Sequence, residues 1–255
     1  MKPELLGEYG LFIGGKWKPA SDGATFTATS PATGEVLSTC AQATEGDVQD
    51  AVDAAWEAFD TWKKTTPSER AAILNKVADI IDENTELLAT VESMDNGKPI
   101  RETMAIDIPL SAKHFRYFAG ALLADEGSAS VLDEQFLSII LHEPIGVVGQ
   151  IVPWNFPFLM AAWKLAPVLA AGDCTVFKPS SDTSLSVLEF ARLVQDVIPA
   201  GVFNVVTGSG SKCGQYILDN PGFRKLAFTG STEVGKNVAM AAADKLIPAT
   251  LELGG

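Results

Sequence analysis

The chain has 255 residues, 47% of them apolar and 20% charged, so it can bury a sizeable core and is neither a disordered chain nor a low-complexity array. Its 19 basic and 32 acidic residues give a net charge of −13, which argues against binding to nucleic acid or to an anionic membrane surface. Three scattered cysteines without histidine or cysteine partners at metal-ligand spacing indicate a reducing, cytoplasmic setting and no metal site.

The first third of the chain is predicted to form hairpins and then two helices. Residues 1–10 show no basic region before an apolar block, so no signal peptide is expected. Apolar runs mixed with turn residues over 12–17 and 30–36 indicate hairpins. Thr44 and Thr66 each precede an acidic residue by three positions, a spacing typical of capping boxes, and each opens a stretch of helical periodicity. We expect the first helix to reach Trp62 and the second to extend through Leu88.

Beyond residue 145, short β-rich runs alternate with helical segments. The run at 156–172 is interrupted by a lysine and two prolines, so it is predicted to be a buried helix and not a membrane span. The alternation predicts an α/β fold with a parallel sheet and crossover helices. Residues 127–141 differ, because they are predicted to form two strands about a turn at 133–134 and could be an arm. The predicted strands of the sheet cover residues 145–152, 174–177, 203–206, 225–228 and 249–253.

Polar or glycine-rich turns follow the predicted strands, at the edge where ligands of parallel sheets bind. Their sequences are PWNFP at 153–157, KPSS at 178–181, GSGSKCG at 208–214 and TGSTEVG at 229–235. Glycines and hydroxyls before a helix allow a pyrophosphate to approach. Each turn also has a plain structural alternative. The glycine-rich turn could be only a tight turn, residues 229–231 could be only a helix cap, and Lys178 could be an ordinary surface lysine.

Two residues are candidates for catalysis. Asn155 could stabilise an oxyanion through its side-chain amide, or it could simply form the turn. Glu252 lies in an apolar run, so it could be a general base with a raised pKa, or it could face solvent from an edge strand. We assign structural roles to the two histidines and three cysteines, which lack partners at ligand or triad spacing: His114, His142, Cys40, Cys174 and Cys213.

The order of these motifs resembles the NAD(P)-dependent aldehyde dehydrogenase superfamily. The resemblance rests on the motifs at 153–157, 178–180, 228–235 and 251–255 (LELGG), and it extends to IGGKW at 13–17 and SPATG at 30–34. It therefore covers essentially the whole chain. Residues 96–99, 101–102, 107–110 and 114–120 are most similar to bacterial acetaldehyde and short-chain aliphatic aldehyde dehydrogenases.

The resemblance implies oxidation of a small aldehyde, such as acetaldehyde, to the carboxylic acid. In that chemistry a Cys thiolate attacks the aldehyde, hydride passes to nicotinamide, and water hydrolyses the thioester. Asn155 would donate its amide to the oxyanion, and Glu252 would activate the thiol or the water. Lys178 would hold the adenosine ribose, and residues 229–231 would lie at the pyrophosphate. The expected cofactor contacts are Ile151, Pro153, Trp154, Lys178, Ser180, Ser181, Gly210, Gly214, Phe228, Thr229, Gly230 and Ser231.

The resemblance also implies how the chain is divided. Residues 1–126 and 142–255 would form one discontinuous, Rossmann-like dinucleotide-binding domain, and 127–141 an arm for homo-oligomerisation. The family's nucleophilic Cys lies beyond the Glu-Leu-Gly-Gly motif, and no cysteine here matches it. We therefore expect the catalytic domain to be absent from this chain, which could be a fragment, a truncated product or an engineered domain.

Two questions about function remain open from the sequence. Ser181 stands where NAD-preferring members commonly have Glu, so we expect use of both NAD and NADP. The main alternative to an aldehyde dehydrogenase is a nucleotide-binding module without turnover. A protein that keeps only the fold for a structural role is a third possibility, which the completeness of the phosphate-facing turns disfavours.

Overall fold

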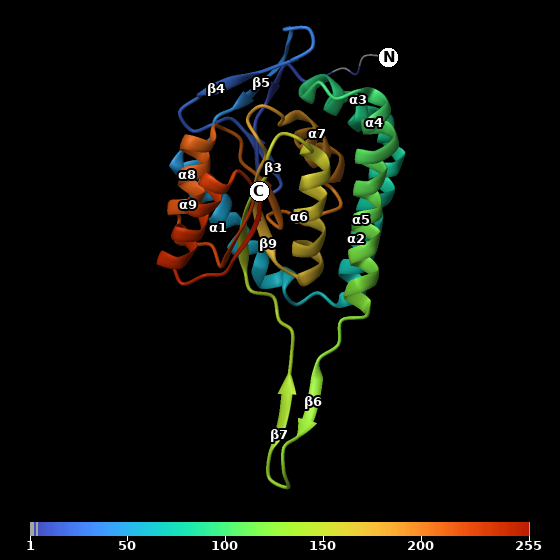
Figure 1. Cartoon of the computed structure of the whole chain (residues 1–255), viewed down its shortest axis with the longest axis vertical. Coiled ribbons are helices and arrows are strands. Elements are labelled where there is room, and N and C mark those ends of the chain that lie inside the picture. The colour runs from blue at the N-terminus through green and yellow to red at the C-terminus, as the bar shows by residue number, and fades with distance from the viewer. Residues whose placement is uncertain (1–2, 4, 255) are drawn as a thin grey trace.

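The computed structural model describes residue 3 and residues 5–254 (Figure 1). Part of the segment 1–10 and Gly255, the last residue of the LELGG motif, lie outside the described residues.

A seven-stranded sheet forms the centre of the structure. Its strand order is β12-β11-β8-β9-β10-β2-β3, and the first five of these strands run parallel. β2 and β3 extend the sheet in antiparallel fashion beside β10. The predicted α/β fold with a parallel sheet is therefore confirmed, with two N-terminal strands added to it. The strands are β2 Leu11–Ile13, β3 Lys16–Lys18, β8 Val147–Ile151, β9 Cys174–Lys178, β10 Phe203–Val205, β11 Lys225–Gly230 and β12 Ala249–Leu253.

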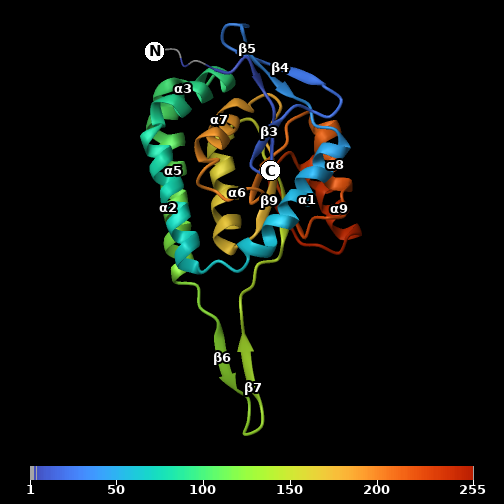
Figure 2. The same ribbon diagram turned by 180° about the vertical axis from the view of Figure 1, so that it is seen from behind.

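Helices cover both faces of this sheet (Figures 1 and 2). One face carries α6 and α7, and the other carries α1, α8 and α9. The antiparallel pair α2 and α5 packs outside α6 as a further layer. The bounds are α1 Glu45–Trp62, α2 Pro67–Glu83, α3 Thr85–Asn96, α4 Ile100–Glu102, the π-helical turn η1 Thr103–Asp107, α5 Ile108–Leu123, α6 Pro157–Ala171, α7 Leu185–Val194, the π-helical turn η2 Gly210–Gly214, α8 Gln215–Asp219 and α9 Thr232–Asp244.

Both predicted capping boxes are present, at Thr44 for α1 and at Thr66 for α2. The predicted length of the second helix was wrong, because α2 ends at Glu83 and α3 begins at Thr85. Between them Asn84 leaves the helical region with φ −114° and ψ 21°, and its side chain donates to the carbonyl of Ile80 at 2.8 Å. This competing side-chain bond is typical of Asn and ends the helix.

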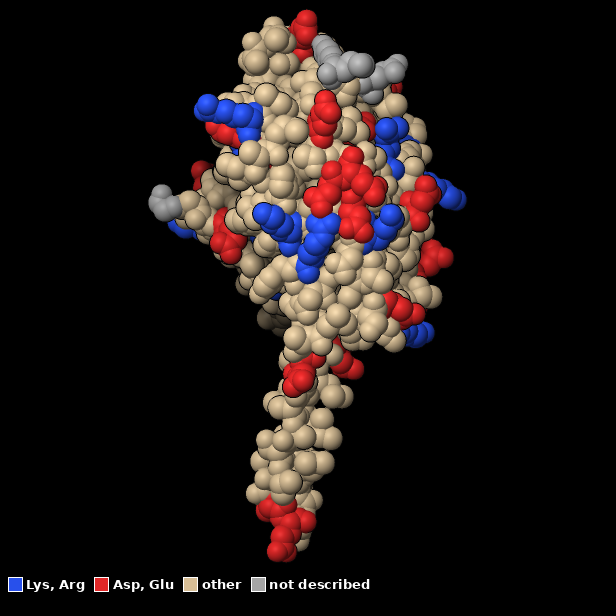
Figure 3. Space-filling view, turned by 90° about the vertical axis from the view of Figure 1, so that its right-hand side faces the viewer, with Lys and Arg blue, Asp and Glu red and all other residues tan. Residues whose placement is uncertain are grey.

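Two smaller sheets stand apart from the centre. One contains β1 Glu8–Tyr9, β5 Val36–Ala41 and β4 Thr25–Thr29. The other is the hairpin of β6 Ser128–Val131 and β7 Leu137–Ile140, which projects from the body as an arm (Figures 1 and 2). Figure 3 shows acidic side chains at the tip of the arm and few charges along its length. The two predicted strands are confirmed, and the role of the arm in assembly stays a prediction.

The core joins the sheet to α6 and α7 through aromatic side chains. Phe190 lies 5.2 Å from Phe158 and 6.0 Å from Phe203 between ring centroids, and all three are buried.

Within the described residues, no helix has the length and apolar character that crossing a membrane requires.

Candidate functional site

The predicted site residues meet at the carboxyl ends of adjacent strands. Ile151 of β8 pairs with Lys178 of β9 on one side and with Phe228 of β11 on the other. One position further along β11, Thr229 pairs with Glu252 of β12. Four neighbouring strands therefore bring these side chains to one edge of the sheet.

Lys178 is buried, with 2% of its surface exposed, so the surface-lysine alternative is wrong. Its Nζ donates to the carbonyl of Pro179 at 3.0 Å, and within the described residues it makes no ion pair. Burial lowers its pKa, and the nearby carboxylate of Asp182 opposes that change. An ammonium group has three hydrogens to donate, and one of them has a protein acceptor here. The other hydrogens have no acceptor among the described residues, so they could be donated to a ligand.

The turns at 208–214 and 229–235 have different structures. Ser231 is the N-cap of α9, and its hydroxyl accepts from the amide of Val234 at 3.4 Å, so the helix-cap alternative describes its observed role. The segment from Gly210 to Gly214 is one π-helical turn leading into α8. A Cβ placed on Gly214 would lie 3.9 Å from Cε of Lys178, so the end of this turn packs on the lysine.

Asn155 lies in the exposed turn between β8 and α6. Its neighbour Trp154 lines a cavity of about 380 Å³ together with Ser181, which follows β9. Two predicted cofactor contacts, from the loops after β8 and β9, therefore share this cavity. Ser180, half-buried, begins the same turn, and its carbonyl accepts from the hydroxyl of Ser184 at 2.8 Å.

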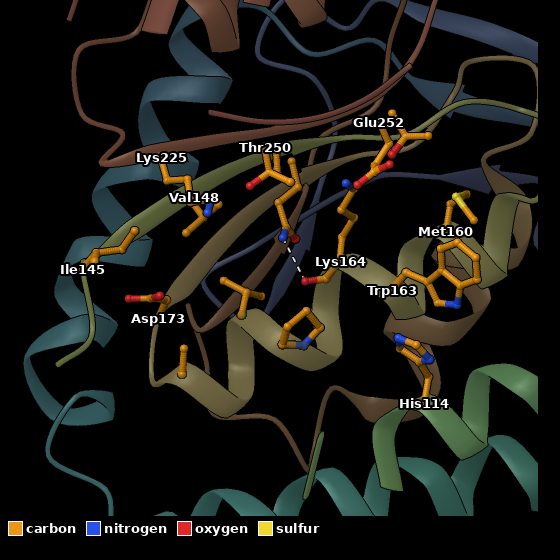
Figure 4. Close-up of a pocket in the computed structure, with 16 residues that line it drawn as sticks. His114, Ile145, Val148, Met160, Trp163, Lys164, Asp173, Lys225, Thr250 and Glu252 are labelled. Carbon is orange, nitrogen blue, oxygen red and sulfur yellow. Dashed lines mark hydrogen bonds between the residues drawn. The ribbon is translucent and has the colours of Figure 1, made fainter. Parts of the chain in front are cut away.

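Glu252 is exposed on β12, which forms an edge of the sheet, as the edge-strand alternative expects. It also faces a larger cavity of about 660 Å³ between α6 and the strands β8, β11 and β12 (Figure 4). Lys164 of α6 points toward the Glu252 carboxylate across that cavity. Burial lowers the pKa of Lys164, and the charge of Glu252 opposes the decrease.

Sequence reasoning missed Lys164 as a functional candidate. A signal was present in the sequence, because Lys164 is a lone charge in an otherwise apolar helix. We used this charge only to argue against a membrane span. Among the described residues, no hydrogen bond or ion pair links Asn155 to Glu252.

The three cysteines are fully buried and unpaired by disulfides. Burial raises the pKa of each thiol to about 12, so each is protonated at neutral pH. A thiol nucleophile needs a lowered pKa and access to substrate, and none of Cys40, Cys174 and Cys213 has either. Within the described part of the chain, no cluster of three or more His, Cys, Asp or Glu is placed to hold a metal ion.

The histidines have packing and surface contacts. His114 stacks near Trp163, with 5.7 Å between ring centroids, and contacts Phe118. Nδ1 of His142 lies 2.9 Å from the carboxylate of Asp125 at the base of the arm. Among the described residues, neither histidine makes a hydrogen bond or ion pair with Asn155 or Glu252, although His114 lines the same cavity as Glu252.

Comparison with known proteins shows what the chain is similar to. The sequence model of the aldehyde dehydrogenase family matches residues 17–255. Aldehyde dehydrogenases of Rhodospirillum rubrum and Paracoccus denitrificans are 51% and 50% identical over 247 residues, which are 97% of this chain and 49% of each relative. The solved NAD⁺ complex of an aldehyde dehydrogenase from Bacillus cereus superposes with a TM-score of 0.95 at 41% identity, covering 97% of this chain and 51% of that one. The chain thus spans about half the length of the curated relatives it matches.

Proposed function

The chain belongs to the aldehyde dehydrogenase family, and from that premise we propose that its 255 residues form the NAD(P)-binding part of an enzyme that oxidises a small aliphatic aldehyde to the acid. The observation that carries this proposal is the buried, incompletely satisfied Lys178 at the carboxyl end of a parallel strand. Ligands of open parallel sheets bind at that end.

The residues at the strand ends would hold the cofactor. Lys178 would donate to its adenosine ribose, and the N-terminus of α9 after Thr229 and Gly230 would lie at its pyrophosphate, because backbone amides there favour an anion. Trp154 and Ser181 would line the adjacent part of the cleft. When bound, the nicotinamide supplies a hydride acceptor. The solved relatives in complex with NAD⁺ support this choice of cofactor.

The chain's own residues would then serve the aldehyde. Asn155 would donate its side-chain amide to the negative oxygen that develops on the carbonyl carbon. Glu252 would accept a proton from the attacking group. Lys164 faces Glu252 across the cavity, so it would place its amino group close to this base.

None of the chain's cysteines would supply the nucleophile, because all three thiols are buried and protonated. We therefore expect the 255 residues alone to bind nucleotide without oxidising acetaldehyde. Turnover by the isolated chain, measured as NADH absorbance, would contradict this expectation. A nucleotide-binding module without turnover is the second candidate function, and the same thiol burial favours it.

Calorimetric titration of NAD into the chain tests the cofactor site. The change Lys178→Met should weaken binding by tenfold or more, because the ribose loses charge-assisted hydrogen bonds worth about 1.5–3 kcal/mol. Lys113→Met, at an exposed position on α5, is the matched control and should leave the dissociation constant unchanged. If the wild-type chain binds no NAD, or if both variants bind like it, the proposed site is wrong.

We infer use of both NAD and NADP from Ser181. A glutamate at this position would repel a 2′-phosphate, by about 4 kcal/mol for unit charges 4 Å apart at an effective dielectric constant of 20. The serine removes that repulsion and can donate to a phosphate oxygen. Both cofactors should be titrated into wild type and into Ser181→Glu. Wild type should bind NAD and NADP with similar affinity, and Ser181→Glu should reject NADP. If wild type already rejects NADP a hundredfold, Ser181 does not have this role.

We further propose a homo-oligomer in the cytoplasm. The arm exposes apolar side chains on both of its strands, including Val131, Leu137 and Ile139, and exposed apolar surface of this kind favours association. Three free thiols support a reducing compartment.

A further inference from the structure

The turn that carries Asn155 makes few bonds of its own. It follows β8 and precedes α6, and residues 154–156 are exposed. Phe156, the N-cap of α6, has φ −140° and ψ 67° and makes no side-chain capping bond. Pro157 then opens the helix without an amide hydrogen to give. A turn with so little local bonding needs support from elsewhere to hold a side chain in one place.

That support comes from the C-terminal end of α3 and the residues after it. Oε2 of the Glu92 carboxyl group accepts from the amide of Phe158 at 2.9 Å, so α6 is capped by a residue 66 positions earlier. Glu92 is fully buried. This contact fixes where the turn enters α6.

Two further contacts hold the residues on either side of Asn155. The side chain of Asn96 donates through Nδ2 to the carbonyl of Trp154 at 2.6 Å. Nζ of Lys98 lies 3.6 Å from the centroid of the Phe156 ring, a distance at which an ammonium is attracted to an aromatic face. Asn155 is thus the one residue between two neighbours that are each held by the same short segment.

The segment itself is held firmly. Lys98 pairs with the buried carboxylate of Asp107 at 2.5 Å, so its ammonium has a second partner besides the Phe156 ring. Gly97 ends α3 with φ +82°, and a Cβ there would approach Pro31 to 2.9 Å, so the backbone between Asn96 and Lys98 is closely packed. The contacts to the turn therefore originate from a rigid base.

We propose that Glu92, Asn96 and Lys98 are positioning residues that set the orientation of the Asn155 side chain for the reaction. The proposal rests on the role of Asn155 under the proposed function. Rate in such sites depends steeply on placement, and an error of about 1 Å can cost on the order of 10²-fold. None of the three contacts involves Lys178 or the glycine-rich turn, but Asn96 lines the same cavity as Trp154 and Ser181, so the effect of their loss is measured on kcat at saturating NAD.

A double-mutant cycle in an active chimera tests this coupling. The chimera carries these 255 residues in place of the matching half of the Rhodospirillum rubrum relative. At saturating NAD, Asn96→Ala should lower kcat about tenfold, and in the Asn155→Ala background it should lower kcat no further. Asn75→Ala, exposed on α2, is the matched control. If the two substitutions lower kcat by factors that multiply in the double variant, Asn96 does not act through Asn155. That result would overturn the proposal.

The two proposals can fail separately in this experiment. If Asn155→Ala leaves kcat unchanged, the role of Asn155 in the proposed function is wrong. If Asn155→Ala lowers kcat but Asn96→Ala does not, the positioning role is wrong.

A second measurement uses the chain itself and needs no turnover. With 5-fluorotryptophan incorporated, the ¹⁹F resonance of Trp154, assigned by Trp154→Phe, reports on the turn. Asn96→Ala and Phe156→Leu should each shift or broaden this line, and neither removes the Lys98–Asp107 pair. Glu92→Gln keeps an acceptor for the Phe158 amide and should leave the line in place, whereas Glu92→Leu should move it. An unchanged line in Asn96→Ala and Phe156→Leu would overturn the proposal.

Discussion

Asp95 should make the stability of this protein depend on pH in a way that one substitution removes. The residue is 3% exposed, and its Oδ2 accepts from the amide of Leu185 at 2.8 Å. Oδ1 has no hydrogen-bond partner among the described residues. Burial raises the pKa of Asp95 from 3.8 to about 7, with the charge of Asp182 adding to the rise and the Leu185 amide opposing it.

The direction of this pH dependence follows from the raised pKa of Asp95. Between about pH 4 and pH 7 the folded state keeps the proton while the unfolded state has lost it, so the free energy of unfolding falls as pH rises. Each pH unit in that range lowers the free energy of unfolding by up to about 1.4 kcal/mol. From about pH 4 to pH 7 the decrease amounts to about 4 kcal/mol in all. Above pH 7 the contribution is constant.

Asp95→Asn keeps an oxygen acceptor for Leu185 and carries no charge at any pH. We expect it to match wild type near pH 4 and to be more stable at pH 8, by up to about 4 kcal/mol. Urea denaturation of both proteins at half-unit steps from pH 4 to pH 8 measures the difference, with Asp244→Asn on exposed α9 as the control. Parallel curves for wild type and Asp95→Asn would refute the reasoning, as would a gap that widens toward low pH.

Three further predictions concern packing, capping and assembly. Thr44→Ala removes the N-cap of α1 and should lower the free energy of unfolding by about 1 kcal/mol in urea, with an unchanged slope. Gly201→Ala should cost more, about 1–3 kcal/mol, because its φ is +80° and a Cβ would lie 2.5 Å from the carbonyl oxygen of Ala54; Gly23→Ala, with φ +73° and open space around it, measures the backbone strain alone. Light scattering should show oligomers of the chain and a smaller species after deletion of residues 127–141, and a clean wild-type monomer at micromolar concentration would disprove association.

Local sequence signals predicted the helix starts well and one helix end badly. The boxes at Thr44 and Thr66 depend on residues three positions apart, so the sequence contains the whole interaction. The break at Asn84 was missed because Leu87 and Leu88 continue the apolar spacing across it. Hydrophobic periodicity reports the buried face and is insensitive to one residue that turns the chain.

The sequence predicted which site residues lie together, because ligands of parallel sheets bind at the carboxyl ends of the strands. It did not predict the residues from elsewhere in the chain that contact them. Ile151, Lys178 and Phe228 are neighbours because parallel strands end together. Nothing local connects Asn96 to Trp154, 58 positions away, or Lys164 to Glu252. Such contacts depend on how helices pack against the sheet, which residue spacing alone does not specify.

The sheet joins strands from opposite ends of the chain, and this has a consequence for biosynthesis. The amide of Gly14 donates to the side chain of Asn204, 190 positions later, where β2 meets β10. Contacts of such long sequence separation slow folding, because the intervening chain must first be ordered. A ribosome adds about 5–20 residues per second, so roughly 10–40 s pass between the synthesis of β2 and that of β10. Over that interval the β2–β3 hairpin emerges from the ribosome before the strand that completes its pairing exists.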